Sequence, residues 1–507
     1  MDSKMFEEFK GKKWLSLFSL FFLFILFFEM LFFMMRPLHE EFNDFLADLT
    51  GSSINYVALL IGIIAIPLIY SAYLVINNGI KIGKTQEAKP HLANKIIAPI
   101  VFAIFIFLFY YLISTFGEEA FLIKNMLAHY SVYLYLFLII CIIIFIYPLS
   151  TQISKLMKKT TSKIFSPKVE KSLILGGLMI IYLFLFAFPM IFQPVYVLGG
   201  DLPAKPGIIA HRGGQHYTPE NTVIAAVYAN QIGADGMEID VQLSLDGIPF
   251  LLHDSTLERT TDAEEVFPSR ENYLADNFTI AELTSLNAGA WFTTTDPYGT
   301  INEGKIPTDL LDDYEIAMLP TLEELLDYVN DTNLLLNVEL KYISDNHPYF
   351  DQFSDIVLDV LIEADMDDQI WVQSPNEAIL DQVESLAPEI NSMLNIGDEP
   401  PTPEDFDDKG YDMINTHYSL SNKIFKEYIE AGIMVNIYTV DLKLSFQQAW
   451  ALGVSYVTTN EPADFIEMTR PTWYLSKGLY IGIWIIIEVV GIVLILILKY
   501  VKMKKNI

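Results

Sequence analysis

Six long apolar stretches constrain this 507-residue chain more than any other feature of its sequence. A helix of about 20 apolar residues crosses the roughly 30 Å of hydrocarbon in a bilayer. The stretches are residues 14–35, 54–76, 96–116, 131–150, 172–192 and 479–498. The first is too long for the core of a signal peptide and lacks a small-residue cleavage site before Arg36, so we interpret it as a retained anchor. The sequence therefore predicts an α-helical membrane domain with five spans in residues 1–199, and a sixth span with a basic tail in residues 473–507.

The charges between these stretches predict how the chain is oriented. Lysines concentrate at the N-terminus, in the second and fourth loops and after the sixth stretch, whereas the first loop is acidic. Because basic loops remain in the cytoplasm, we expect both termini to be cytoplasmic and residues 200–472 to be extracytoplasmic. Glu29 and Glu488 fall within the spans. Each could make a polar contact or line a path for a small ligand, or could be a protonated residue with no chemical role.

Residues 200–472 have a different composition from the rest of the chain. They contain 50 of the 63 acidic residues and 11 of the 32 basic ones, a balance of −39. Such a segment repels phosphate backbones, which excludes nucleic acid as a partner. The single cysteine, Cys141, lies in an apolar stretch, so no intrachain disulfide can form and the fold must be held together by core packing.

Short apolar runs alternate with amphipathic helical patterns in residues 200–472. The candidate strands are residues 207–210, 237–243, 249–252, 334–340, 369–373, 392–396, 413–415, 434–440 and 455–459. This alternation favours the α/β class and a TIM-type (β/α)8 barrel, inserted as an ectodomain between transmembrane helices five and six. A closed barrel needs eight strands, so one of the nine candidates is expected to be misassigned or to lie outside it. An open doubly wound sheet is the alternative, although no glycine-rich nucleotide loop accompanies it.

Three local patterns refine this prediction. Thr218-Pro219-Glu220 predicts the start of a helix, with Thr218 as its N-cap. Residues 262–320, approximately, have few strand signals and several aromatic residues, and we interpret them as an insertion that covers one face of the barrel. Glycosylation sequons occur at Asn277 and Asn330, and they matter only in a eukaryotic cell.

Charged residues cluster at the carboxyl ends of the predicted strands, where barrel enzymes keep their sites. The residues are His211, Arg212, Glu238, Asp240, His253, Glu339 and Lys341. Because side chains alternate along a strand, Glu238 and Asp240 point to the same face. Two buried carboxylates side by side repel each other unless they are protonated or bind a cation. Taken singly, each element has a structural interpretation: a hydrogen-bonded histidine, a solvated edge or an ion pair. Taken together, they favour a site with a chemical role.

The residue types in this cluster indicate which chemistry it could perform. Three carboxylates favour one hard divalent cation, Ca²⁺ or Mg²⁺, and no set of cysteines and histidines fits zinc. Two histidines beside such a metal suit a general base and a general acid. Arg212 and Lys341 can hold an anionic group. The metal and these two cations together favour a phosphodiester substrate, whose transition state needs its oxygens neutralised.

The motifs resemble the signature of the glycerophosphodiester phosphodiesterase family. The matching runs are His211-Arg212-Gly213, Pro219-Glu220-Asn221-Thr222, Glu238-Ile239-Asp240-Val241, Asp246-Gly247 and His253-Asp254. The arrangement is similar to that of the six-transmembrane animal members, whose catalytic domain is extracellular. Val266-Phe267-Pro268 and the run from Leu286 to Phe292 also look like that subgroup.

The resemblance implies a metal-dependent barrel enzyme that splits a glycerophosphodiester into glycerol phosphate and an alcohol. By the family pattern, His211 and His253 would be the acid/base pair, without an assignment of which is the base. Glu238, Asp240 and Glu339 would bind the metal. Arg212 and Lys341 would bind the phosphate, and Tyr438 would line the substrate site. Either water or the neighbouring glycerol hydroxyl could attack first, the second route passing through a cyclic phosphate.

Two runs depart from the family pattern. Where the family usually has Trp-Thr-Val-Asn, this chain has Tyr438-Thr439-Val440-Asp441, and an expected Thr-Asp pair is Thr459-Asn460. Both follow strand candidates, and we expect them to affect the choice of head group more than the chemistry.

The leading hypothesis is a phosphodiesterase at the outer membrane surface, acting on glycerophosphodiesters or lysolipids and in contact with membrane lipid. A phospholipase of the lysophospholipase D or C type on the same barrel is one alternative. A second is a non-catalytic membrane receptor that binds a phosphodiester. A third, transport by the first five helices, lacks the paired intramembrane charges expected of a transporter.

Overall fold

The computed structural model describes residues 14–15, 17–26, 29, 54–83, 90–115, 187, 193 and 196–505, except 271, 342, 398–399, 419, 421 and 472–473. The chain divides into two units, residues 1–194 with 481–507, and residues 195–480. The predicted spans at 131–150 and 172–192 lie outside the described residues, apart from residue 187.

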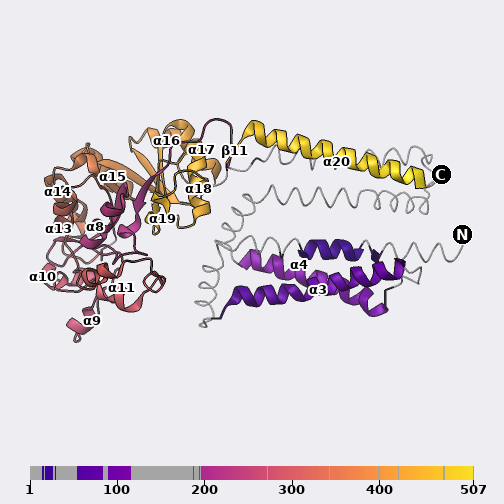
Figure 1. Ribbon diagram of the computed structural model, residues 1–507. Coiled ribbons are helices and arrows are strands. Elements are labelled where there is room, and N and C mark those ends of the chain that lie inside the picture. The colour runs from indigo at the N-terminus through magenta and orange to yellow at the C-terminus, as the bar shows by residue number, and fades with distance from the viewer. Residues whose placement is uncertain are drawn as a thin grey trace. The chain divides into compact units, whose positions relative to one another are not determined.

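Eight parallel strands form a closed barrel in residues 195–480 (Figure 1). They are β2 (Gly207–Ala210), β3 (Gly236–Leu243), β5 (Leu335–Leu340), β6 (Ile370–Ser374), β7 (Asn391–Ile396), β8 (Met413–His417), β9 (Met434–Tyr438) and β10 (Tyr456–Thr459). The sheet runs from β3 through β5 to β10 in chain order and closes where β2 pairs with both β10 and β3. The predicted barrel is therefore confirmed, and the open doubly wound alternative is wrong.

The ninth strand candidate lies outside the barrel. It is β4 (Pro249–Leu251), which pairs antiparallel with the end of β3. The turn between them contains Gly247 at φ 83°, a left-handed conformation that suits glycine. The hairpin returns the chain alongside β3, so that His253 follows β4 close to the carboxylates of β3.

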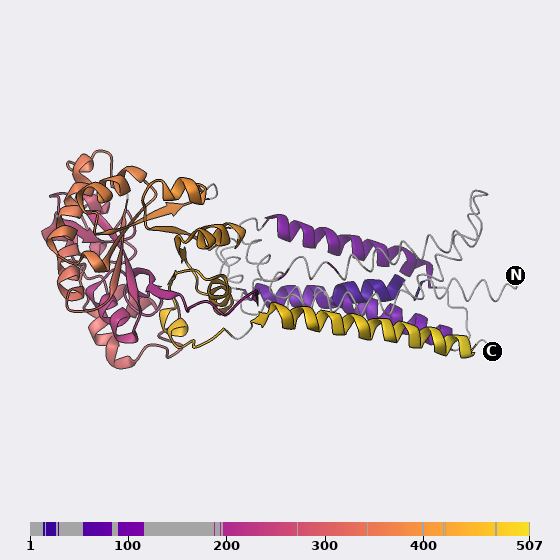
Figure 2. The same cartoon turned by 90° about the horizontal axis from the view of Figure 1, so that it is seen from above.

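Helices follow the strands and lie around the outside of the barrel, as Figure 2 shows. They are α8 (Val223–Ile232), α13 (Leu322–Val329), α14 (Phe353–Glu363), α15 (Glu377–Leu386), α16 (Pro403–Asp407), α17 (Asn422–Ala431), α18 (Lys443–Leu452) and α19 (Pro462–Ile466). α13 begins with a capping box formed by Thr321 and Glu324. Its leucines at helical spacing, Leu322, Leu325 and Leu326, are buried in the same apolar core as Val241 and Val338 of the strands and the alanines of α8. Burial of these apolar faces holds the helices to the barrel.

The predicted helix start at Thr218 is wrong. α8 begins at Val223, and its N-cap is Thr222, whose Oγ1 accepts a hydrogen bond from Ala225 N. Residues 218–221 instead form a buried loop in which Asn221 has φ 55°. A polar loop is buried here because its side chains hydrogen-bond to charged groups at the carboxyl ends of the strands.

The chain between β4 and α13 forms short helices around two small apolar cores. The helices are α9 (Ala263–Val266), η3 (Ala275–Asn277), α10 (Ile280–Leu283), α11 (Ala290–Thr295), η4 (Thr308–Leu310) and α12 (Leu311–Glu315). One core gathers Phe250, Phe278 and Leu283, and the other joins Phe292 and Tyr314 to residues near α8. The insertion is thus attached to the barrel by aromatic packing.

The other unit contributes apolar helices. They are α3 (Tyr56–Gly83) and α4 (Leu92–Thr115), with α20 (Lys477–Lys505) beginning in the barrel unit and continuing beyond it. Within the described residues, one stretch, Tyr56–Lys81, is long and apolar enough to cross a membrane by length and composition. Leu17–Leu26 and Leu92–Phe105 are shorter apolar helical stretches. A two-stranded sheet, β1 (Val197–Leu198) with β11 (Leu475–Ser476), joins the two ends of the barrel unit.

Candidate active site

A triad of carboxylates lies at the carboxyl ends of two neighbouring strands. Glu238 and Asp240 come from β3 and Glu339 from β5, and one oxygen of each lies within 4.8 Å of the others. The register of the two strands pairs Asp240 directly with Glu339. Glu238 and Asp240 are 2% and 0% exposed. The alternation along β3 that the sequence predicted therefore brings both carboxylates to one face, beside the third.

The pKa values of two carboxyl groups in the triad are shifted in opposite directions. Burial, and then the charges of Asp240 and Glu339, raise the pKa of Glu238. Burial also acts to raise the pKa of Asp240, but Lys341 and Arg212 outweigh it and hold that pKa below its ordinary value. Among the described residues, the buried Oδ1 of Asp240 accepts no hydrogen bond. That oxygen instead forms an ion pair with Lys341 Nζ at 3.3 Å. An acidic, oxygen-only site of this kind fits a hard divalent cation.

Both cations predicted to bind phosphate lie against this triad. Lys341 Nζ is 3.3 Å from Asp240 Oδ1 and 3.3 Å from Glu339 Oε1. Arg212 Nε is 3.4 Å from Asp240 Oδ2. The backbone of Arg212 is left-handed, at φ 50°, and its N–H donates to Glu238 Oε2 at 2.9 Å. This strained position, which costs on the order of 1 kcal/mol, places the guanidinium beside the carboxylates.

The two predicted histidines flank the triad and have different partners. His211 follows β2, with Nδ1 2.6 Å from Asn460 Oδ1 and Nε2 3.9 Å from Glu238 Oε2. Burial, and then the charge of Arg212, lower the pKa of His211 to about 4. His253 follows β4, with Nδ1 2.7 Å from Asp254 Oδ1. One imidazole is thus held by an amide and the other by a carboxylate.

An ion network next to His253, centred on the buried Glu220, was not predicted from the sequence. Arg259 donates to both oxygens of Glu220 at 2.7 Å and to Asp254 Oδ2 at 2.5 Å. Arg212 donates to Glu220 Oε1 from the other side, at 3.0 Å. The hydrogen bond from His253, together with that from Arg259, lowers the pKa of Asp254. Glu220 therefore links the two sides of the site.

Asn221 from the same loop holds Asp240 of the triad in place. Its Nδ2 donates to Asp240 Oδ2 at 2.7 Å, and its Oδ1 accepts from Asp240 N at 3.1 Å. Pro219-Glu220-Asn221 was noted in the sequence as a family motif. The signal that could have assigned it to the site is an unbroken run of polar residues inside a domain whose strands are apolar.

A belt of amides fills the barrel interior next to the triad. Gln373 donates to Glu339 Oε2 at 3.2 Å and accepts from Asn337 at 3.1 Å and from Asn415. Asn436 continues the belt by donating to Asn415 Oδ1 at 2.8 Å. This chain of hydrogen bonds leads to Gln373, which holds Glu339 in place.

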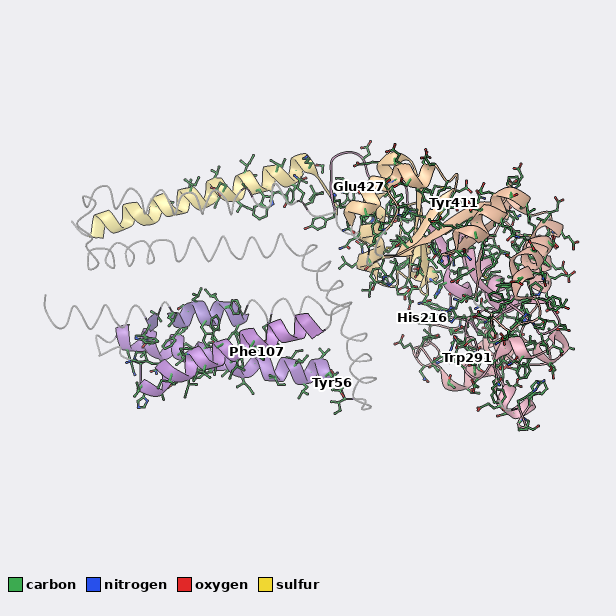
Figure 3. The ribbon with its side chains drawn as sticks, turned by 180° about the vertical axis from the view of Figure 1, so that it is seen from behind. Tyr56, Phe107, His216, Trp291, Tyr411 and Glu427 are labelled. Atoms are coloured by element: carbon green, nitrogen blue, oxygen red, sulfur yellow. The ribbon has the colours of Figure 1, made fainter. Side chains whose placement is uncertain are left out.

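Aromatic residues line the rim of the site. Tyr438, at the end of β9, is half-buried, and burial, followed by the charge of Glu339, raises its pKa. On the His211 side, His216 stacks on Tyr298 at 4.4 Å and lies 2.8 Å from Glu461 Oε1. Figure 3 labels His216 and, from α11 of the insertion, Trp291, whose ring lies 5.8 Å from the Arg259 guanidinium. The insertion thus contributes rings to the edge of the site.

Comparison with known proteins identifies the family. Residues 211–464 match the model of the glycerophosphoryl diester phosphodiesterase family. The chain belongs to this family. The predicted resemblance is confirmed, and the match begins at His211 and covers every strand of the barrel except β2.

Several relatives are similar over different lengths of the chain. Glycerophosphoinositol inositolphosphodiesterase GDPD2 of Mus musculus is 31% identical over 65% of this chain and 60% of its own length. Glycerophosphodiester phosphodiesterase domain-containing protein 4 of Mus musculus is 25% identical over 88% of this chain and 72% of its own. The chain spans 60%, 58% and 48% of the lengths of the first three relatives. A solved structure of an Oleispira antarctica phosphodiesterase with the product sn-glycerol-3-phosphate is 27% identical, with a TM-score of 0.43, over 51% of this chain and 95% of that one.

Proposed function

We propose that this chain hydrolyses glycerophosphodiesters to glycerol phosphate and an alcohol. The observation that carries the proposal is the triad of Glu238, Asp240 and Glu339 together with two histidines, each fixed by a hydrogen bond. A structural ion-pair cluster would not need two imidazoles next to a carboxylate triad. Membership of the glycerophosphoryl diester phosphodiesterase family supports the same reaction.

Glu238, Asp240 and Glu339 would hold one Ca²⁺ or Mg²⁺. When bound, such an ion neutralises charge on the phosphate oxygens as they approach the transition state. Lys341 and Arg212 lie beside the triad and are placed to bind the other phosphate oxygens. Tyr438 is placed to contact the substrate at the rim. Each carboxylate is itself held by a neighbour, such as Asn221 on Asp240 and Gln373 on Glu339.

The different partners of the two histidines suit different roles. Asn460 Oδ1 accepts a hydrogen bond from His211 Nδ1, which leaves the Nε2 lone pair to accept a proton, as a general base does. His253 Nδ1 is held by the Asp254 carboxylate, and we assign His253 the other role, that of the general acid. The attacking hydroxyl would lose its proton to His211 as its oxygen bonds to phosphorus. The alcohol would leave with the proton of His253 as its bond to phosphorus breaks.

Two attacking groups fit this arrangement, water or the neighbouring glycerol hydroxyl. Attack by the hydroxyl would give a cyclic glycerol phosphate that water then opens, with the two histidines exchanging roles. Quenched reactions followed by ³¹P NMR separate the routes, because only the second produces a cyclic phosphate before glycerol phosphate.

The test is hydrolysis by the purified full-length protein. Glycerophosphocholine, glycerophosphoglycerol, glycerophosphoinositol and a lysophospholipid are each supplied with Ca²⁺, Mg²⁺ or chelator, beside Glu238→Gln. Both sides of the diester are assayed, because the name of the GDPD2 relative refers to inositol phosphate. We expect metal-dependent release of glycerol phosphate that the variant lacks. Lysophosphatidic acid as the product would indicate a phospholipase, and binding without turnover of any substrate would indicate a receptor and contradict the proposal.

We also propose that the barrel is extracytoplasmic, carried between spans five and six of a six-span chain with both termini in the cytoplasm. The division is residues 1–199, 200–472 and 473–507. The alternation of basic and acidic loops supports this orientation. The apolar helix Tyr56–Lys81 has the length and composition to cross a membrane. Contact with membrane lipid would then keep the site close to lipid-linked substrates.

The two sequons provide the test of orientation, because Asn277 and Asn330 are both exposed on the barrel unit. Expression in animal cells is followed by treatment with an N-glycosidase. A mobility shift that disappears in the Asn277→Gln, Asn330→Gln double variant is expected. If the wild-type chain shows no shift, while a sequon engineered into the second loop does, the orientation is the reverse of the one proposed.

A further inference from the structure

The departures of this chain from its family pattern, Asp441 and Asn460, meet in space. They follow β9 and β10, which are adjacent in the barrel. Asn460 N donates to Asp441 Oδ1 at 2.8 Å, and Asn460 Nδ2 donates to Asp441 Oδ2 at 2.8 Å. Thr459 Oγ1 adds a third hydrogen bond to Asp441 at 3.2 Å. The two residues therefore form a carboxylate–amide pair at the ends of neighbouring strands.

This pairing fixes which way the amide of Asn460 faces. A carboxylate only accepts hydrogen bonds, so the NH₂ of Asn460 must point at Asp441 and its Oδ1 must point away. Oδ1 then lies 2.6 Å from His211 Nδ1 and accepts a second hydrogen bond from Gln215 Nε2 at 2.9 Å. An amide oxygen cannot donate, so the proton of this contact is on His211 Nδ1.

We propose that Asn460 and Asp441 are positioning residues that set the tautomer and orientation of His211. This inference rests on the proposed function and deepens it. Asp441 orients Asn460, Asn460 holds the proton on His211 Nδ1, and Nε2 is left as a proton acceptor on the side of Glu238. The sequence predicted that these two residues affect the choice of head group, and that stays a prediction. Their side chains contact His211 and each other.

Swapping the carboxylate and the amide between residues 441 and 460 tests the proposal. Asn460→Asp places two carboxylates against each other, and Asp441→Asn leaves an amide whose orientation is no longer fixed. Each single variant is expected to lower kcat by about 10- to 100-fold, as loss of an orienting partner does, with little change in KM. The double variant, Asp441→Asn with Asn460→Asp, restores one carboxylate and one amide and is expected to recover most of the activity.

The controls separate this inference from the proposed function. Asp412→Asn removes a carboxylate that accepts from Ser392 N at 2.8 Å, at the start of β7, away from the histidines, and should leave kcat unchanged. Thermal unfolding and Ca²⁺ binding are measured for every variant. Singles that change only KM, or a double variant no better than the singles, would overturn the positioning role. Full activity of His211→Ala would instead overturn the proposed function.

Discussion

The two sides of the candidate site contain the same residue type in opposite surroundings. On one side, His211 contacts a neutral amide that Asp441 holds from behind. On the other, His253 contacts the Asp254 carboxylate, which Arg259 and then Glu220 hold in place. Each imidazole is thus held through Nδ1 by a different kind of group, an amide oxygen on one side and a carboxylate on the other. This contrast is the reason for proposing different roles for the two histidines.

The largest loss of activity should come from a change in the carboxylate triad that leaves the partners of both histidines intact. Glu238→Gln keeps the shape of a buried side chain and removes one negative charge from the triad. We expect a loss of kcat/KM of about 10³-fold or more, because charge stabilisation at the phosphate is lost. The measurement is hydrolysis of glycerophosphocholine over a range of Ca²⁺ concentrations. Chelation of the wild-type protein should mimic the variant, and activity that survives chelation would exclude a metal role.

A smaller loss of activity should come from removing the carboxylate partner of His253 alone. Asp254→Asn replaces the carboxylate that pairs with both His253 and Arg259. We expect kcat to fall by about 10- to 100-fold, because the ring loses the partner that orients it. Steady-state kinetics measure the change. Arg270→Lys, which alters an ion pair with Glu282 on the insertion, is the matched control and should have no effect. An equal loss in the control would mean that the site responds to any change in the domain.

The smallest effect is expected at the rim on the His211 side. Tyr298 stacks on His216, and its hydroxyl donates to Gln215 Oε1 at 3.4 Å. Tyr298→Phe keeps the ring and loses one long hydrogen bond, which is worth on the order of 1 kcal/mol or less. We therefore expect kcat/KM to change by less than about fivefold. A comparison of several head groups measures it. A large loss confined to one head group would show that the hydroxyl contacts that substrate.

The sequence predicted those parts of the site that depend on local geometry. Alternation along one strand was enough to place Glu238 and Asp240 on a common face, and the positions of strand ends were enough to bring His211 and Glu339 to the same edge. Apolar periodicity likewise predicted the barrel. The antiparallel return of β4 could not be predicted, because a three-residue strand has the same pattern inside a barrel or beside one.

The residues that hold the charged side chains of the site in place could not be predicted, because their contacts join distant parts of the chain. Asn460 reaches His211 across 249 positions only because β10 closes the barrel against β2. Glu220 lies in a loop that looks like a helix start, and its two arginine partners are visible only once that loop is folded. Residues whose partners are set by closure of a barrel leave no periodic signal in the sequence.

The dependence of each histidine variant on the leaving group tests whether His211 and His253 have the proposed roles. Glycerophosphocholine, whose alcohol needs a proton to leave, is compared with a glycerophosphodiester of p-nitrophenol, which leaves without one. His253→Ala should lose about 10²-fold or more on the first substrate and much less on the second, whereas His211→Ala should lose activity on both. Equal losses for the two variants on both substrates would contradict the division of roles, and full activity of both would contradict the site itself.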